Sequence, residues 1–187
     1  RLVNAWRYSP GRKIYGGVEF SPVKDMLRTK SLQLPDTPKF NEYTGLAITP
    51  KAGNCELIKK HILEALCSNE TSAYEYVLNW FARMYQYPGD RGHTALVFAG
   101  GQGSGKGSIL EDVVAHSFGA HGVVMANPKE LTSEFNKGFA TSVYVYINEA
   151  AWGGNQKDNS VLKALITDPT IRLRAMRRDP ITIKNCV

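Results

Sequence analysis

The sequence has little cysteine and no long apolar run, and each shortage excludes a class of protein. Its three cysteines, Cys55, Cys67 and Cys186, are an odd number without C-x-x-C spacing, which argues against a disulfide framework and a zinc site. No apolar run approaches the roughly 18 residues that a membrane span needs, so we expect no membrane partner. Together with the lack of a signal peptide, these shortages predict a soluble protein of a reducing, cytoplasmic compartment. Because the first residue is Arg1 rather than Met, we also expect the chain to be part of a longer polypeptide.

The composition is typical of one globular domain. At 187 residues, of which 43% are hydrophobic, the chain is long enough for one α/β domain with a substantial core and a small accessory segment. The net charge of +6 makes a polyanionic partner plausible without identifying one. The four histidines are scattered without a metal-ligand partner, so we expect ordinary core or surface roles for them: His61, His93, His116 and His121.

Residue patterns divide the chain into three segments. Residues 1–50 are rich in Pro, Gly and aromatic residues, which favours short strands and turns in a linker segment. Residues 51–90 carry apolar residues at helical spacing and predict a helical subdomain of two helices, split at 68–71 where Ser, Asn and Thr offer a cap. Residues 91–187 are predicted to form an α/β domain with a parallel sheet.

Short apolar runs and amphipathic stretches alternate in the third segment. The expected strands are 94–99, 122–126 and 142–147, and the expected helices are 108–118 and 128–139. Because the run at 94–99 is unbroken, we expect that strand to be buried on both faces of the sheet.

A glycine-rich loop follows the first expected strand directly. In residues 100–108, Gly100, Gly105 and Lys106 match the G-x-x-x-x-G-K spacing of a phosphate-binding loop. Glycines let backbone amides wrap a phosphate, the next helix presents its positive end, and the lysine reaches the β and γ phosphates. We therefore assign nucleotide binding to the whole loop: Gly100, Gly101, Gln102, Gly103, Ser104, Gly105, Lys106, Gly107 and Ser108.

The loop departs from the common pattern after its lysine. Gly107 stands where Ser or Thr usually binds Mg²⁺, and Ser108 follows one place later. We expect ATP and Mg²⁺ as cofactors, with the Ser108 hydroxyl or a water molecule as the magnesium ligand.

The expected strand at 142–147 ends in an amide and a carboxylate, Asn148 and Glu149. ATP hydrolysis needs a group that orients and deprotonates water near the γ phosphate, and Glu149 lies at a spacing from Lys106 that is ordinary for a motor ATPase. Lys106 and Glu149 are the predicted catalytic residues. Asn148 stands where Asp is commonest, and we expect it to hold Mg²⁺ indirectly. A strand that simply ends in a polar turn is the alternative.

Further short motifs accompany these features between residues 40 and 187. They are Phe40-Asn41-Glu42-Tyr43-Thr44-Gly45, Asn79-Trp80-Phe81-Ala82, Gln86-Tyr87-Pro88, Phe135-Asn136, Glu149-Ala150-Ala151-Trp152-Gly153-Gly154 and Leu162-Lys163-Ala164-Leu165-Ile166-Thr167. With the Gly-Lys-Gly form of the loop, the chain resembles the superfamily 3 helicase domain of phage and plasmid primase-helicases, including the deep-sea vent phage primase-polymerase type. The resemblance implies a P-loop NTPase fold of the AAA+-like kind.

The resemblance also implies an activity and its partners. Such domains hydrolyse ATP to move on single-stranded DNA as a homo-oligomeric ring, a hexamer or similar, joined to a primase-polymerase module. If the protein is phage-encoded, its compartment is the cytoplasm of the bacterial host. The family further implies a sensor Asn on an additional strand inside the sheet, and an arginine finger, both beyond residue 187. Asn185 comes too early to be that sensor.

A basic hairpin is predicted near the C-terminal end. Residues 170–176 and 181–184 alternate polar and apolar side chains, and Arg177-Arg178-Asp179-Pro180 supplies turn residues. The family places its DNA-gripping hairpin after the strand that ends in the acidic residue, which implies DNA contacts from Lys163, Arg172, Arg174, Arg177 and Arg178. A solvated basic edge strand that only prevents aggregation is the alternative.

Two other functions fit the phosphate loop. Nucleoside monophosphate kinases use a similar Gly-Lys-Gly loop, although they place it at the start of the chain. The other alternative is an inactive nucleotide-binding assembly module, which Gly107 and Asn148 favour.

Overall fold

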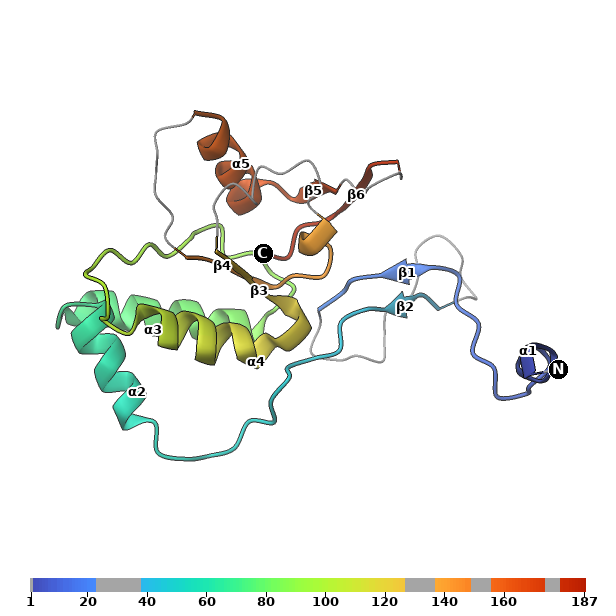
Figure 1. Cartoon of the computed structure of the whole chain (residues 1–187), viewed down its shortest axis with the longest axis horizontal. Coiled ribbons are helices and arrows are strands. Elements are labelled where there is room, and N and C mark those ends of the chain that lie inside the picture. The colour runs from blue at the N-terminus through green and yellow to red at the C-terminus, as the bar shows by residue number, and fades with distance from the viewer. Residues whose placement is uncertain (1, 23–37, 127–136, 149–155, 174–178) are drawn as a thin grey trace.

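The computed structural model describes residues 2–22, 38–126, 137–148, 156–173 and 179–187, and Figure 1 shows their arrangement. The α-helices are α1 (Leu2–Arg7), α2 (Glu56–His61), α3 (Thr71–Gln86), α4 (His116–Phe118) and α5 (Gln156–Thr167). Two π-helical segments, η1 (Ile62–Leu66) and η2 (Ser108–Ala115), continue α2 and precede α4. Short 3-10 turns are η3 (Gly119–His121) and η5 (Lys137–Phe139). The strands are β1 (Val18–Glu19), β2 (Phe40–Asn41), β3 (Gly122–Met125), β4 (Tyr144–Ile147), β5 (Thr170–Leu173) and β6 (Ile181–Lys184).

The described strands form three pairs. β1 and β2 are parallel, β3 and β4 are parallel with Gly122 opposite Tyr144, and β5 and β6 are antiparallel with Thr170 opposite Lys184. Two expected strands and the C-terminal hairpin are thereby confirmed, and the class is mixed helix and strand, compatible with α/β. The expected helix at 128–139 lies mostly outside the described residues. Its last three residues are described, and they form the 3-10 turn η5.

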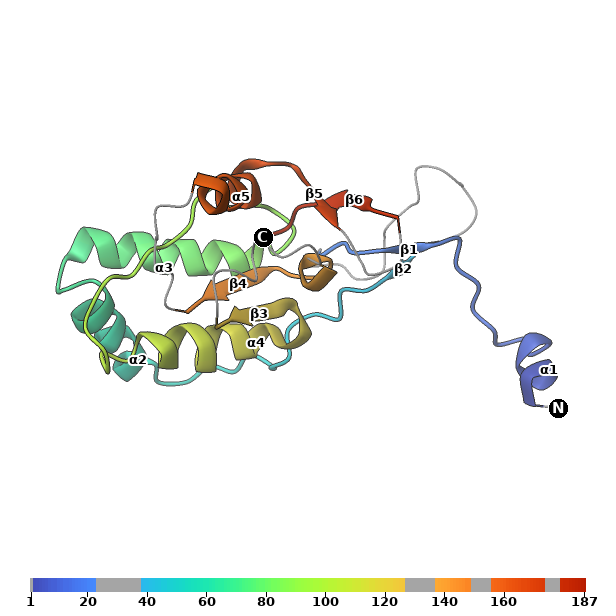
Figure 2. The ribbon, with the colours of Figure 1, turned by 45° about the horizontal axis from the view of Figure 1, so that its top comes forward.

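The β3–β4 pair separates two apolar cores. Tyr144 and Tyr146 belong to the core made with α3 and the η2–α4 helix, where Phe118 is 1% exposed. Val145 and Ile147, the alternate residues of the same strand, pack against α5 and the β5–β6 hairpin. Successive side chains of a strand point to opposite faces, so one short strand serves both cores. Figure 2 shows β3 and β4 between α4 on one side and α5 with the hairpin on the other.

The two expected helices of residues 51–90 are present, but their junction differs from the expectation. Ser68 and Asn69 adopt left-handed backbone angles, with φ of 51° and 63°. They therefore form the turn that reverses the chain, and Glu70 occupies the cap position of α3 without a side-chain cap bond. The expected polar cap is wrong because these side chains lie in a left-handed turn, a conformation that Asn tolerates better than most residues.

The expected strand at 94–99 is also corrected by the structure. This segment has no strand pairing among the described residues, and Val97 is 68% exposed. Leu96 and Phe98 are half-buried against the first core. Exposed and half-buried side chains therefore alternate along residues 96–98, so the segment packs on one side only. A cavity separates its backbone from β4.

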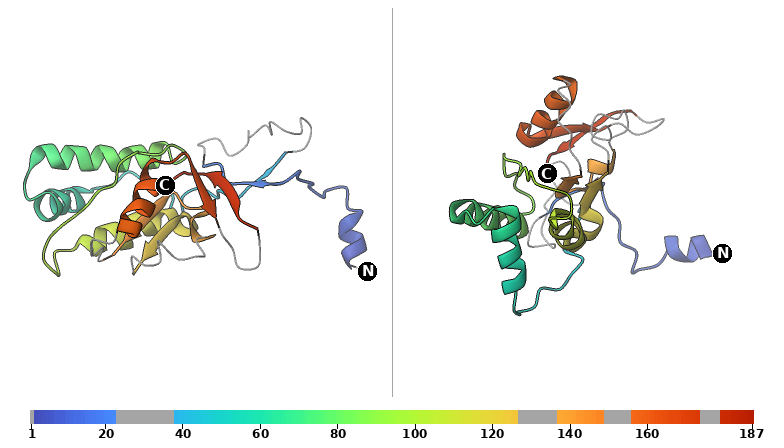
Figure 3. Two further views of the ribbon diagram at one scale, coloured as in Figure 1. Left: turned by 90° about the horizontal axis from the view of Figure 1, so that it is seen from above. Right: turned by 60° about the vertical axis from the view of Figure 1, so that its left-hand side comes forward.

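The segment around β2 is tied to the core by a buried histidine. The Thr44 amide donates to His121 Nε2 (3.0 Å), and His121 Nδ1 donates to the Thr141 carbonyl (2.8 Å). The Tyr43 and His121 rings lie 4.9 Å apart. Residues 40–47 therefore contact the α/β core directly, whereas α1 lies away from it (Figure 3).

Asn185 joins α5 to β6. Its side chain is completely buried, and Nδ2 donates to the carbonyls of Leu165 (2.7 Å) and Asp168 (2.9 Å). Its Oδ1 accepts from the Val187 amide (3.1 Å). Because the last carbonyls of a helix lack intrahelical partners, this amide side chain closes the end of α5.

Two features of the fold bear on the expectations from the composition: the state of the cysteines and the lengths of the helices. All three cysteines are free, and burial raises the pKa of the Cys67 and Cys186 thiols. Within the described residues, no helix combines the length and the apolar character that crossing a bilayer requires.

Candidate nucleotide-binding site

The glycine loop leads from segment 94–99 into the helix that continues as η2. Gly103 and Gly105 have φ of 78° and 76°, a left-handed conformation that glycine adopts at little cost. The Ile109 amide donates to the Gly105 carbonyl (3.3 Å), so the first helical turn starts from the loop itself. The spacing of glycines in the sequence is therefore matched by the backbone angles that a tight loop requires.

Lys106 folds over the loop that precedes it. Its Nζ donates to the carbonyls of Gly100 (3.1 Å) and Gly101 (2.8 Å) and to Ser104 Oγ (2.8 Å). These three bonds use all three donors of the ammonium group. The charge is thus held at the centre of the loop, where a phosphate oxygen would compete with neutral oxygens for the same donors and form the stronger, charge-assisted bonds.

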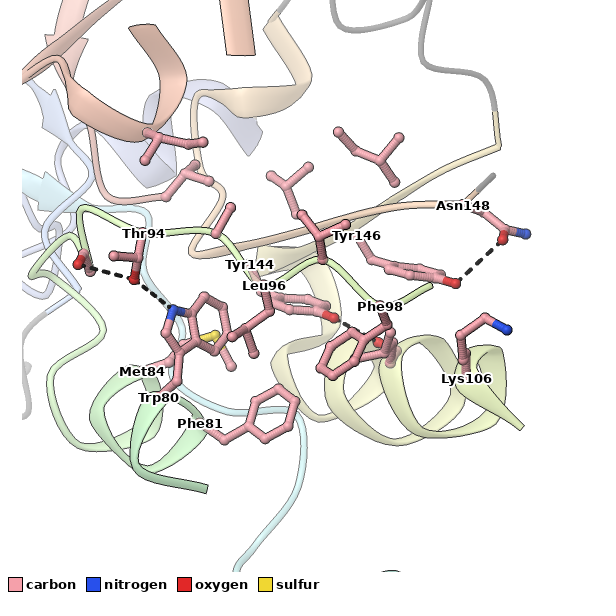
Figure 4. Close-up of a pocket in the computed structure, with 18 of the residues that line it drawn as sticks. Trp80, Phe81, Met84, Thr94, Leu96, Phe98, Lys106, Tyr144, Tyr146 and Asn148 are labelled. Atoms are coloured by element: carbon pink, nitrogen blue, oxygen red, sulfur yellow. Dashed lines mark hydrogen bonds between the residues drawn. The ribbon is translucent and has the colours of Figure 1, made fainter. Parts of the chain in front are cut away.

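The end of β4 faces this loop. The Tyr146 hydroxyl donates to Asn148 Oδ1 (3.3 Å), and the Asn148 amide donates to the Met125 carbonyl (2.8 Å). Figure 4 shows Asn148, the Tyr146 hydroxyl and Lys106 at the same end of one cavity. The structure therefore brings together the lysine and the amide that the sequence singled out. Glu149 lies outside the described residues.

The cavity has a volume of about 1260 Å³ and extends away from the loop between α3, segment 92–108, β4 and α5. Its walls are largely apolar and include Trp80, Phe98 and Tyr144. Among the described residues, β4 pairs only with β3, so its second edge borders this cavity. The cavity thus has a polar end at the loop and a long apolar part beyond it.

Side chains of α3 hold the segment that leads into the loop. Thr94 Oγ1 accepts from Trp80 Nε1 (3.2 Å) and from the Tyr76 hydroxyl (3.4 Å). Arg83 donates to the backbone carbonyls of Asp90 (3.1 Å) and Arg91 (2.6 Å). The helical segment before the loop therefore fixes where the loop begins. The short motif around Trp80 was the only sequence signal for this role.

Residue patterns did not single out His61, which packs on the loop. A Cβ placed on Gly105 would lie 2.5 Å from His61 Nε2 and 2.6 Å from His61 Cε1. The Nε2 atom is buried and has no hydrogen-bond partner. A histidine far away in the sequence therefore touches the glycine just before Lys106.

The oxygen-rich groups at the loop suit a hydrated magnesium ion. Ser108 is exposed in the first turn after the loop, and Asn148 supplies an amide oxygen. No group of three or more His, Cys, Asp or Glu that could hold a metal exists within the described segments. The neutral oxygens of Ser108 and Asn148 could hold Mg²⁺ only as part of a shell that keeps several waters and includes nucleotide phosphates.

The hairpin places one of the predicted DNA contacts at the surface. On β5, Ile171 and Leu173 are buried, whereas Thr170 and Arg172 are exposed. Lys163, on α5, is exposed as well. The expected alternation is confirmed for this strand. The other three arginines among the predicted DNA contacts lie outside the described residues: Arg174, Arg177 and Arg178.

Comparisons with known proteins show similarity to one family and to one group of structures. Residues 98–187 match the Family of unknown function (DUF5906). No curated protein matches the sequence. Two solved A-form apo structures of the NrS-1 C terminal region, the second covering 305–718, share 25% identity with the chain over 92% of its length, with TM-scores of 0.71 and 0.68. A further apo structure of the same region (305–718) gives a TM-score of 0.70.

The chain spans only part of those structures. It covers 40% or 41% of their length, about two fifths. The fold of this chain is therefore similar to one part of the NrS-1 C terminal region.

Proposed function

We propose that this chain is the ATP-binding core of a replication motor, a superfamily 3-type helicase or translocase that hydrolyses ATP to move on single-stranded DNA. The observation that carries the proposal is the position of Lys106, whose ammonium is held at the centre of a left-handed glycine loop and shares one end of a cavity with Asn148. A glycine loop before a helix, facing the carboxyl end of a parallel strand, is where ligands bind in α/β proteins. The fold similarity to the NrS-1 C terminal region supports a role in replication.

Each group then has a distinct task in the proposed reaction. Lys106 exchanges its bonds to Gly100, Gly101 and Ser104 for bonds to the β and γ phosphates, and the loop amides bind the remaining phosphate oxygens. Bound Mg²⁺ would neutralise charge on the β and γ phosphate oxygens. Asn148 orients water on the side of β4, and Glu149, the next residue, accepts the proton of the attacking water.

Two substitutions test this division of labour. We expect Lys106→Ala to abolish tight ATP binding, because the lysine neutralises phosphate charge directly. Glu149→Gln should retain binding and lose hydrolysis, because the carboxylate acts only on the attacking water. The measurements are ATP affinity by titration and phosphate release on the intact protein with single-stranded DNA. Hydrolysis by Glu149→Gln at the parent rate would show that Glu149 is not the general base.

Two departures from the common pattern favour a second function, an inactive nucleotide-binding module that stabilises subunit contacts. Gly107 replaces the usual magnesium-binding hydroxyl, and Asn148 replaces an Asp and already accepts a bond from Tyr146. Tight ATP binding without phosphate release in the presence of DNA would support this function. Transfer of the γ phosphate to added AMP would instead indicate a nucleoside monophosphate kinase.

A further inference from the structure

The contact between His61 and Gly105 joins two segments that lie far apart in the sequence. His61 is the last residue of α2, and the π-helical segment η1 starts at the next residue, where the Cys67 amide donates to the Ile62 carbonyl (3.0 Å). Gly105 comes shortly before the second π-helical segment, η2. Such segments are rare and occur frequently at functional sites. In Figure 2, α2 lies beside the start of the helix that follows the loop.

The close approach depends on glycine. Real Cβ atoms do not come within 3.0 Å of a non-bonded heavy atom, yet one on Gly105 would lie 2.5 Å from His61 Nε2. The imidazole therefore fills the space that the missing side chain leaves on the phosphate loop. A side chain at position 105 would therefore force the imidazole at the end of the His61 side chain to move.

The polar edge of the ring is the part that packing does not explain. Nε2 is buried without a hydrogen-bond partner, which is destabilising for a polar atom. An apolar side chain of similar size would fill the same space without that penalty. The loop contains oxygens that a moving Lys106 would release, including Ser104 Oγ, which now accepts from Lys106 Nζ (2.8 Å).

We propose that His61 is a positioning residue of the nucleotide site, whose Nε2 gains a hydrogen bond to an oxygen of the loop or of the phosphate it holds when nucleotide binds. This inference rests on the proposed function, because it requires ATP to bind the loop. It makes α2 responsive to the occupancy of the loop, through a contact that is present in the folded chain and completed by the ligand.

Two substitutions at His61 separate the hydrogen bond from packing. His61→Leu keeps much of the volume and removes the polar edge, so the affinity for ATP should fall about tenfold, the equivalent of about 1.4 kcal/mol. Its thermal stability without nucleotide should stay equal to or above that of the parent, because the unpaired buried atom is gone. His61→Gln restores a polar terminus and should recover most of the affinity. His116→Leu, at an exposed histidine of α4, is the matched control and should change neither quantity.

The outcomes distinguish this inference from the proposed function. If the parent protein binds no ATP, the proposed function fails, and the inference fails with it. If the parent binds ATP and Lys106→Ala does not, equal affinity of His61→Leu and parent overturns the inference alone. A parallel loss of stability and affinity in His61→Leu also overturns it, since that result indicates packing only.

A spectroscopic measurement needs no substitution at all. In ¹⁵N-histidine-labelled protein, the His61 Nε2 resonance should shift on addition of ATP and not on addition of adenosine, which lacks phosphates. The resonance can be assigned in the parent protein by through-bond correlation with the His61 backbone. An Nε2 resonance that ATP leaves unchanged would refute the proposed hydrogen bond even if every His61 variant failed to fold.

Discussion

Tyr144 shows how a single side chain connects the β3–β4 pair to the helix after the glycine loop. Its hydroxyl donates to the Leu110 carbonyl (3.1 Å), and its ring lies 6.2 Å from that of Phe118. Burial, with a smaller contribution from neighbouring tyrosines, raises the pKa of Tyr144 far above its ordinary value. Burial raises the pKa of Tyr43 and Tyr85 in the same direction.

These shifts imply a loss of stability in alkaline solution. Above about pH 10, the tyrosine ionises in the unfolded chain but stays protonated in the folded one, so the folded state binds more protons and its stability falls as pH rises. We expect Tyr144→Phe to lower the free energy of unfolding at pH 7 by about 1 kcal/mol, through the lost hydrogen bond. The same variant should show a shallower decline above pH 10.

Denaturant titrations at pH 7 and in the alkaline range measure both effects. Tyr87→Phe is the matched control, because Tyr87 is 58% exposed. Tyr43 and Tyr85 keep their raised pKa values in the variant, so only part of the pH dependence of stability should disappear. An alkaline slope identical to that of the parent would show that Tyr144 is not one of its sources.

At the scale of elements, the β5–β6 hairpin combines a confirmed structure with an untested role. Its alternation buries Ile171 and Leu173 against α5 and leaves Arg172 exposed. Asn185 and Lys184, at the end of β6, are bonded to the rest of the fold, the latter through the Gly89 carbonyl (2.9 Å). The base of the hairpin is therefore firmly held, as an element that transmits force to DNA would require.

We expect the arginines of this hairpin to contact DNA phosphates. Replacing Arg177 and Arg178 by Ala should lower the affinity for single-stranded DNA and flatten its salt dependence by about 0.7 for each lost contact. Phosphate contacts carry little sequence information, so the loss should be similar for different sequences. Fluorescence titrations from low to physiological salt measure the slope.

The control removes the same charge elsewhere. Lys59 and Lys60 lie on α2, where they pair with Glu56 (3.1 Å) and Glu64 (3.8 Å), and their replacement by Ala should leave the slope unchanged. An equal change of the salt slope in both double variants would show that net charge alone, rather than the hairpin, sets the DNA affinity. An unchanged slope in the hairpin variant would support the alternative of a solvated edge.

At the scale of the whole molecule, the glycine loop lies at one end of a large cavity rather than in a closed sheet. The second edge of β4 and the unpaired segment 94–99 border the cavity, and Cys186 and Val187 line it as well. Among the described residues, neither the second edge of β4 nor segment 94–99 has a strand partner, so the cavity between them keeps largely apolar walls.

We expect the active protein to be a ring in which each ATP lies between neighbouring subunits. A lone loop leaves the γ phosphate open to water, and an arginine from the next subunit would close the site and stabilise charge in the transition state. Multi-angle light scattering of the intact protein with a non-hydrolysable ATP analogue should show an oligomer, and Lys106→Ala should reduce its formation. A strict monomer under those conditions would exclude the ring.

Local patterns in the sequence determined the glycine loop, the strands β3 and β4, the alternation of β5, and the two helices of residues 51–90. These features depend on residues that are close along the chain: backbone freedom at Gly103 and Gly105, and a period of two or of about 3.6 residues in side-chain burial. The roles of Glu149, Arg174, Arg177 and Arg178 stay predictions, since these residues lie outside the described part of the chain.

Only the tertiary structure decided where segment 94–99 lies and what touches the loop. An apolar run predicts burial but not a partner, and here the partners are Trp80 and Tyr76 of α3, which bind Thr94. His61 reaches Gly105 because α2 and the loop fold together, and no pattern within either segment encodes the other. Contacts between distant segments depend on how the helices pack around the strands, which is why the sequence by itself determined the loop while the fold decided its surroundings.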